Sequence, residues 1–159
     1  MDLGQLFHSF RKEAFRLERL PQYMVDEEVE ALRLFHDTGT IPQDFNKEWA
    51  ELVKANVDSG KRMLRLRLLS DELTDYECFE LTAYPKSIKA GEDIRTDSRS
   101  LYPESQDFWV FDMKWIGLMN YDSDGRFLSA TTRKLTESDV KQVQYWKLVY
   151  EGAKSLLQN

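Results

Sequence analysis

The chain has 159 residues and a formal net charge of −6, and 42% of its residues are hydrophobic while 31% are charged. This length and composition suit an ordinary globular protein with its own core, not a disordered segment. The acidic excess argues against sequence-independent binding to a phosphate backbone, which needs a supply of Lys and Arg. The single cysteine, Cys78, excludes an intramolecular disulfide and a cysteine-based zinc site.

The N-terminal residues and the apolar runs of the chain indicate the cellular compartment of the protein. No apolar run is long enough to span a membrane. The first residues read MDLGQLFHSFRKE and lack the apolar core of a signal peptide. We therefore expect a cytoplasmic protein folded as a single domain over residues 1–159. Its expected parts are a mainly helical region 1–60, a sheet with one inserted helix 61–132, and a C-terminal helix 136–157.

Helical spacing dominates the first sixty residues. An amphipathic N-terminal helix is predicted from apolar residues that recur every three or four positions: Leu3, Leu6, Phe7, Phe10 and Ala14. Residues 15–20 either extend this helix or form a strand, and Pro21 ends the element. Two further helices are expected, one from Asp26 to Gly39 and one over residues 46–58.

The segment 61–69 changes to a period of two, which predicts a strand. Leu64, Leu66 and Leu68 share one face of it, and Arg65 and Arg67 share the other. The two arginines could bind an anion or the carboxylates of a partner. The favoured interpretation is a solvated face or ion pairs within the chain.

A helix and a group of strands follow. Thr74 and Glu77 have the spacing of a capping box, so a helix is expected to begin there and to end near Pro85. Ile94 suggests a short strand, and the polar residues 97–106 suggest an exposed connection. Three strands are predicted over 108–112, 115–121 and 126–132, with a turn at Asp124 and Gly125.

The last predicted element is a long helix that begins at Thr136. Its inward stripe is predicted to contain Val140, Val143, Trp146, Tyr150, Ala153 and Leu157. Together these elements predict an α/β (α+β) fold, with a central mixed or antiparallel sheet of about five strands and helices packed on it.

No pattern of residues indicates nucleophilic or metal chemistry. His8 and His36 are the only histidines, both on predicted helices, and Cys78 has no evident activating partner. The run from Asp122 to Gly125 resembles the start of a calcium loop, but a hairpin turn explains it better. Asp107 and Asp112 bracket a short strand, where turn formation is sufficient cause. We therefore expect no cofactor and no metal.

Several motifs in fixed order resemble a domain-of-unknown-function family that is abundant in actinobacteria. They read FRLE with LPQY (15–23), LTDY with FEL (73–81), AGEDIR (90–95), DFW with FD (107–112) and YD with GRF (121–127). The family has no established activity. Its members are often encoded beside small helix-turn-helix regulators, so the resemblance implies a regulatory role and a protein partner.

A second resemblance concerns the fold alone. The order of elements is similar to one half of a phospholipase D-like domain, of which this chain would be a degenerate copy. That superfamily uses a His-x-Lys motif on the strand that residues 107–112 occupy here. Neither His nor Lys is present there, so phosphodiesterase chemistry is not expected.

Two hypotheses of function follow. The first is a non-enzymatic sensor or partner module, with a regulator or a small ligand bound by a set of polar and aromatic residues. That set comprises Arg16, Glu18, Tyr23, Tyr76, Glu80, Arg95, Asp107, Trp109, Asp112 and Arg126. The second is an enzyme whose site combines Glu80, Arg95, Asp107 and Tyr76. Direct binding of nucleic acid is a third, weaker alternative.

Overall fold

The computed structural model describes residues 1–156. One seven-stranded sheet runs through them in the order β6-β5-β4-β1-β2-β3-β7. The strands are β1 (Glu13–Glu18), β2 (Arg62–Leu69), β3 (Asp93–Ser98), β4 (Phe108–Phe111), β5 (Trp115–Tyr121), β6 (Phe127–Lys134) and β7 (Lys154–Ser155). The helices are α1 (Leu3–Ser9), α2 (Val29–Thr38), α3 (Lys47–Asp58), α4 (Asp75–Ala90) and α5 (Glu137–Gly152), with short 3-10 turns η1 (Asp26–Glu28) and η2 (Arg99–Leu101).

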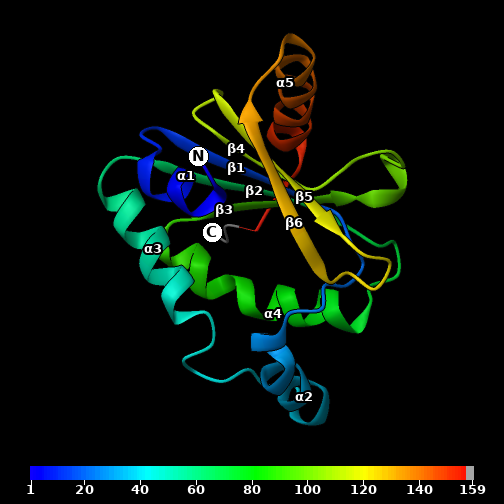
Figure 1. Cartoon of the computed structure of the whole chain (residues 1–159). Helices are drawn as coiled ribbons and strands as arrows, with labels where there is room; N and C mark the ends of the chain where they lie inside the picture. The colour runs from blue at the N-terminus through cyan, green and yellow to red at the C-terminus, as the bar shows by residue number, and fades with distance from the viewer. Residues whose placement is uncertain (157–159) are drawn as a thin grey trace.

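The sheet is mixed. β1 runs parallel to β2, and β2 runs parallel to β3, whereas β4, β5 and β6 form an antiparallel meander beside β1. Helix α5 lies on one side of the sheet and α3 and α4 lie on the other, while α2 projects from the far end of the molecule (Figure 1). The predicted mixed sheet with packed helices is confirmed, and it has more strands than the five expected.

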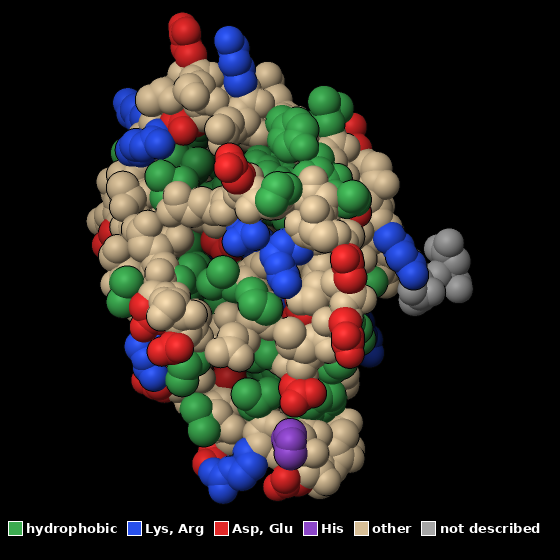
Figure 2. All heavy atoms as spheres, turned by 90° about the vertical axis from the view of Figure 1, so that its right-hand side faces the viewer, with side chains coloured by type: hydrophobic (Ala, Val, Ile, Leu, Met, Phe, Trp, Pro, Cys, Tyr) green, Lys and Arg blue, Asp and Glu red, His purple; other side chains and the backbone are tan. Residues whose placement is uncertain are grey.

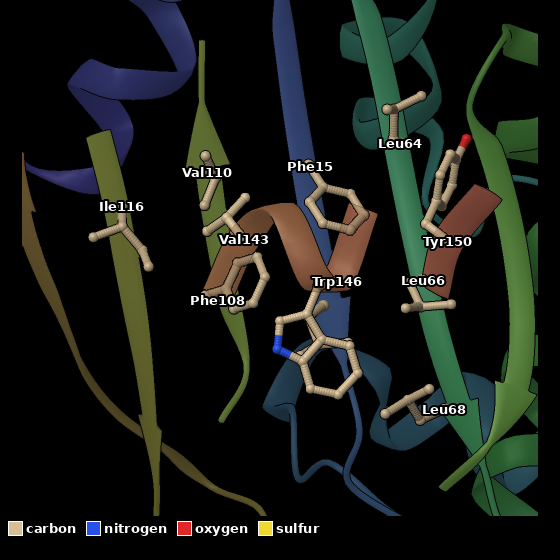
Figure 3. Packing of buried hydrophobic residues seen from close by; sticks show 11 residues of the cluster. Phe15, Leu64, Leu66, Leu68, Phe108, Val110, Ile116, Val143, Trp146 and Tyr150 are labelled. Carbon is tan, nitrogen blue, oxygen red and sulfur yellow. The ribbon is translucent and has the colours of Figure 1, made fainter. Parts of the chain in front are cut away.

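The face of the sheet beneath α5 is apolar. Phe15, Leu64 and Leu66 point toward Trp146 and Tyr150 of α5 (Figure 3). The leucines of β2 therefore occupy this core, as their period of two predicts. Burial of these large side chains is the main stabilising contribution on this side of the sheet.

The opposite face is divided into an apolar and a polar end. At the apolar end, Leu6 and Phe10 pack with Val53, Met63 and Phe111. At the other end, under α4, the residues that point inward from β1 and β2 are charged. Each strand contributes both kinds of residue because alternate side chains point to opposite faces.

The first helix is shorter than predicted. Asp2 and Gln5 form a capping box at its start, but α1 ends at Ser9, and Ala14 lies in β1. Residues 13–18 are buried at every position, so β1 is an interior strand paired on both edges. Phe10 and Ala14 are four residues apart, as on one face of a helix, but they belong to different elements: Phe10 caps the end of α1 and Ala14 lies in β1.

The helix that begins at Thr74 is longer than predicted. The capping box of Thr74 and Glu77 is confirmed, but α4 continues past Pro85 to Ala90. Pro85 removes one amide donor, yet buried residues before and after it hold the helix to the sheet. Gly91, with φ of +119°, ends the helix in the left-handed conformation.

The polar segment 97–106 is more ordered than expected, since Asp97 and Ser98 belong to β3 and η2 follows. At the C-terminus, α5 starts at the predicted residue Thr136, which caps it together with Asp139, but the helix ends at Gly152. Ala153 still packs against the core, while the predicted inward residue Leu157 lies outside the described residues.

The turn from Asp122 to Gly125 joins β5 to β6 as predicted, with the Asp122 amide donating to the Arg126 carbonyl.

Within residues 1–156, no helix is both long and apolar enough to cross a membrane.

Candidate functional site

A cavity of about 530 Å³ lies between the polar end of the sheet and helices α3 and α4. Its walls are mostly aromatic and apolar, with contributions from α1, η1 and the β5–β6 turn. The aromatic lining includes Phe7, Trp49, Phe79, Trp109, Tyr121 and Phe127. Its floor is a group of buried charged residues that β1 and β2 present in alternate positions.

Arg67 contacts two residues of this floor, Glu18 and Glu80, without lining the cavity itself. Its side chain is 0% exposed, and its Nε and Nη2 atoms donate to Glu80 Oε1 of α4 at 3.0 and 2.6 Å. Further bonds run to the carbonyl oxygens of Leu20 at 2.7 Å and Leu68 at 3.0 Å. Arg67 therefore joins the sheet, α4 and the chain that leaves β1.

Arg65 makes the second set of contacts. It donates to Glu92 at 2.7 Å and to Glu18 at 3.0 Å. Glu92 also accepts a hydrogen bond from the indole nitrogen of Trp49 at 3.0 Å. The guanidinium lies 5.6 Å from the Trp49 ring centroid and 5.8 Å from that of Trp109, so it is held by both charge and aromatic faces.

Arg16 makes the third set with Asp107. Its Nη2 atom donates to Asp107 at 3.3 Å and to the Tyr121 hydroxyl at 3.0 Å. Asp107 also accepts a hydrogen bond from Tyr23, and it accepts from the Arg19 amide at 3.0 Å. Asp107 is thus part of the buried network, so turn formation is the wrong explanation for this residue.

The environment shifts the pKa values of two carboxylates in opposite directions. Burial opposes ionisation of Glu18, but Arg65, Arg16 and Arg67 outweigh it and lower its pKa. Burial, followed by repulsion from Glu18, raises the pKa of Glu80 to about 8, although Arg67 opposes the shift. The neighbouring guanidinium groups therefore favour ionisation of Glu18 over ionisation of Glu80.

The solvated face proposed for Arg65 and Arg67 is wrong, and the alternative of ion pairs within the chain is confirmed. The reason is that α4 covers this face and brings Glu80 onto it. The buried arginines are tolerated because each is paired with a carboxylate. The sequence alone does not show that α4 covers them, so their face of the strand looks exposed.

The structure brings together most of the binding set expected from the sequence. The members that line the cavity are Arg16, Glu18, Tyr23, Tyr76, Glu80 and Trp109, and Asp107 bonds to two of them. Arg95 lies on the other face of the sheet, 4.3 Å from the Tyr150 ring centroid. The four-residue enzyme site that includes Arg95 is therefore not assembled.

Two more members of that set lie elsewhere. The carboxylate of Asp112 accepts hydrogen bonds from the amides of residues 11–13, so it fixes the start of β1. Arg126 is partly exposed and contacts Asp26 at 3.3 Å. Both positions indicate structural roles.

Sequence reasoning missed several residues of the cavity: Trp49, Tyr84, Glu92 and Tyr121. Tyr84 follows Glu80 by one helical turn, and its hydroxyl bonds to Glu18 at 2.8 Å. That spacing was the available signal, since residues four apart share a helix face. Glu92 follows the helix-ending Gly91, and no sequence pattern indicated its burial.

The described residues contain no group of three His, Cys, Asp or Glu side chains arranged to hold a metal ion. On the face at the right of Figure 1, basic side chains lie among acidic and hydrophobic ones (Figure 2). This mixed surface does not resemble the basic face of a nucleic-acid-binding protein.

The family model of a domain of unknown function, DUF6879, matches residues 1–156, and the chain belongs to this family. A search of the curated proteins finds no match. The family assignment therefore covers the whole described chain, and the description of the family names no activity.

Proposed function

We propose that this member of the DUF6879 family is a non-enzymatic sensor that binds a small molecule in the cavity and regulates a protein partner. The observation that carries the proposal is a cavity of about 530 Å³ with aromatic walls and a few convergent charged groups. This size and composition are typical of small-molecule sites in proteins.

The charged floor supports a binding role. Burying several ion pairs costs desolvation energy, and apolar residues of similar size often stabilise a fold as well or better. A network that is fully bonded, in contrast, holds its groups in fixed positions. Arg65 and Arg67 are held by at least two partners each, so the floor is organised before any ligand enters.

The position of the cavity offers a route from ligand to partner. Met24, Val25 and Glu28 line it and lead directly into α2. Helix α2 projects from the molecule and exposes Val29, with 55% of its surface accessible (Figure 1). A ligand that contacts this segment would change how α2 is presented. By family resemblance, the expected partner is a helix-turn-helix regulator, in the cytoplasm.

Intrinsic fluorescence tests the binding step. Trp49 and Trp109 line the cavity, whereas Trp115 does not. Aromatic fragments are titrated against the wild type and against Trp109→Phe, with Trp115→Phe as the matched control. We expect saturable quenching that Trp109→Phe reduces and Trp115→Phe preserves. Equal quenching in all three proteins contradicts binding in this cavity.

The partner step is tested separately by size-exclusion chromatography with the regulator encoded next to the gene. The expected result is co-elution that changes when a cavity-binding fragment is present. Failure to co-elute under either condition contradicts the regulatory half of the proposal.

One observation favours a second function, acid/base catalysis at Glu80. Its carboxyl lines the cavity, and its pKa of about 8 suits a general acid near neutral pH. Glu80→Gln then abolishes turnover of a bound molecule without preventing binding. If bound molecules are recovered chemically unchanged from the wild type, this function is ruled out and the sensor remains.

A further inference from the structure

One corner of the cavity has hydrogen-bond donors to spare. The Arg16 side chain is 5% exposed and lines the cavity, and its Nη1 atom is buried without a partner among residues 1–156. Beside it, the Tyr121 hydroxyl accepts from Arg16 Nη2, and no described group accepts its proton. A buried donor without an acceptor is costly, so this corner favours an occupant that brings an acceptor.

The charges around this corner disfavour an anionic occupant. Three guanidinium groups, those of Arg16, Arg65 and Arg67, face four carboxyl groups. These four are Glu18, Glu80, Glu92 and Asp107. Glu18, Glu92 and Asp107 alone therefore match the three guanidinium groups in number, and Glu80 adds a fourth carboxyl group. A further negative charge in this buried place would have no cation left to pair with, and an unpaired buried charge is strongly unfavourable.

The walls next to the corner are aromatic. The Arg16 guanidinium carbon lies 5.9 Å from the Trp109 ring centroid. The Trp109 ring in turn lies 5.8 Å from that of Trp49 and 4.9 Å from that of Phe7. Such rings contact flat aromatic molecules edge-on or face-on.

We infer that the cavity takes an uncharged aromatic molecule that presents a carbonyl-type oxygen to Arg16 and Tyr121. This inference rests on the proposed ligand-binding function and specifies its ligand class. The oxygen accepts from the spare donors, while the flat body of the molecule packs against Trp109 and its aromatic neighbours.

A matched series of probes tests the class. The probes are 2-naphthamide, 2-naphthoate and 2-methylnaphthalene, which share one ring system and differ in charge and in acceptor. Saturation-transfer NMR and calorimetry measure their affinities at pH 7. We expect the amide to bind at least tenfold more tightly than either of the others. Tighter binding by the carboxylate, or equal binding by the hydrocarbon, overturns the inference while leaving the cavity as a ligand site.

A conservative variant tests whether the acceptor oxygen of the ligand binds beside Tyr121. Tyr121→Phe removes only the hydroxyl, so we expect about a fivefold loss of affinity for 2-naphthamide and none for 2-methylnaphthalene. Tyr145→Phe, on the exposed face of α5, is the matched control and leaves both affinities unchanged. An unchanged amide affinity in Tyr121→Phe refutes the placement. If none of the three probes binds the wild type, both the inference and the proposed ligand-binding function fail.

Discussion

Replacing Arg67 with methionine tests whether the charged floor holds this end of the fold together. Arg67 is 0% exposed and donates to Glu80 and to the carbonyl oxygens of Leu20 and Leu68. Methionine fills a similar volume but donates to none of them. The substitution therefore leaves the buried carboxyl group of Glu80 and the carbonyl groups of Leu20 and Leu68 without these hydrogen bonds.

The expected loss follows from these contacts. Removing one partner of a buried ion pair costs about 3–5 kcal/mol, and an unsatisfied buried carbonyl costs about 1–3 kcal/mol. Glu80 lowers its share of the cost because its pKa is already about 8, which favours the neutral form of the carboxyl group that is left behind. We therefore expect Arg67→Met to reduce the free energy of unfolding by about 4 kcal/mol.

Urea unfolding followed by circular dichroism measures this loss, with linear extrapolation to water. Lys54→Met is the control, since the pair of Lys54 with Asp58 is about two-thirds exposed and such pairs contribute little. A second variant, Arg67→Met with Glu80→Leu, removes both partners and should recover part of the loss. A loss below about 1 kcal/mol in the single variant would refute the view that this network stabilises the fold.

Three further predictions concern the pKa of Glu80, the conformation of Gly125 and the net charge of the chain. Because the pKa of Glu80 is about 8 in the folded protein and 4.5 in its reference state, its stabilisation is complete below about pH 4.5 and is lost as the pH rises through 8. Glu80→Gln should remove this decline, which is at most about 1.4 kcal/mol per pH unit, and parallel stability curves from pH 5 to 9 would contradict it. Gly125→Ala should lower the melting temperature well below that of Gly39→Ala: both glycines have positive φ, but only at Gly125 would the new Cβ collide with the Gln22 carbonyl. With a net charge of −6 the protein should not retard a DNA duplex at low salt, and a salt-sensitive shift would show the opposite.

Local signals in the sequence predicted the elements with strong caps. The capping box at Thr74 is present, and the helix start predicted at Thr136 and the helix end predicted at Gly39 coincide with a second capping box and a left-handed glycine. These features depend on residues within one turn of each other, so the sequence contains all the information needed. Helix α4 continues past Pro85 because its burial against the sheet outweighs the local cost of proline. The residues near Pro85 give no indication of this burial.

The candidate site could be predicted only in part, because its residues meet across strands. Arg16 lies opposite Arg65 in the pairing of β1 with β2, and Glu18 lies opposite Arg67. Arg16 and Arg65 are thus like charges side by side, and each is neutralised by carboxylates from other positions: Asp107 for Arg16, and Glu18 and Glu92 for Arg65. The register of a parallel pair is set by the whole βαβ connection, so no short motif indicates these contacts.

Alternation of apolar and charged residues usually indicates a strand with one face in water. In β2 the same alternation belongs to a strand covered on both faces, by α5 over the leucines and by α4 over Arg65 and Arg67. The number of hydrogen bonds that each arginine makes within the protein distinguishes a covered face from a solvated one. Arg67 uses all three of its guanidinium nitrogens within the protein, whereas a solvated arginine would need none of them. A covered sheet face that keeps its charges, instead of replacing them with apolar residues, is more costly to fold. The aromatic cavity lies beside this face, and the proposed ligand-binding function would account for the retained charges.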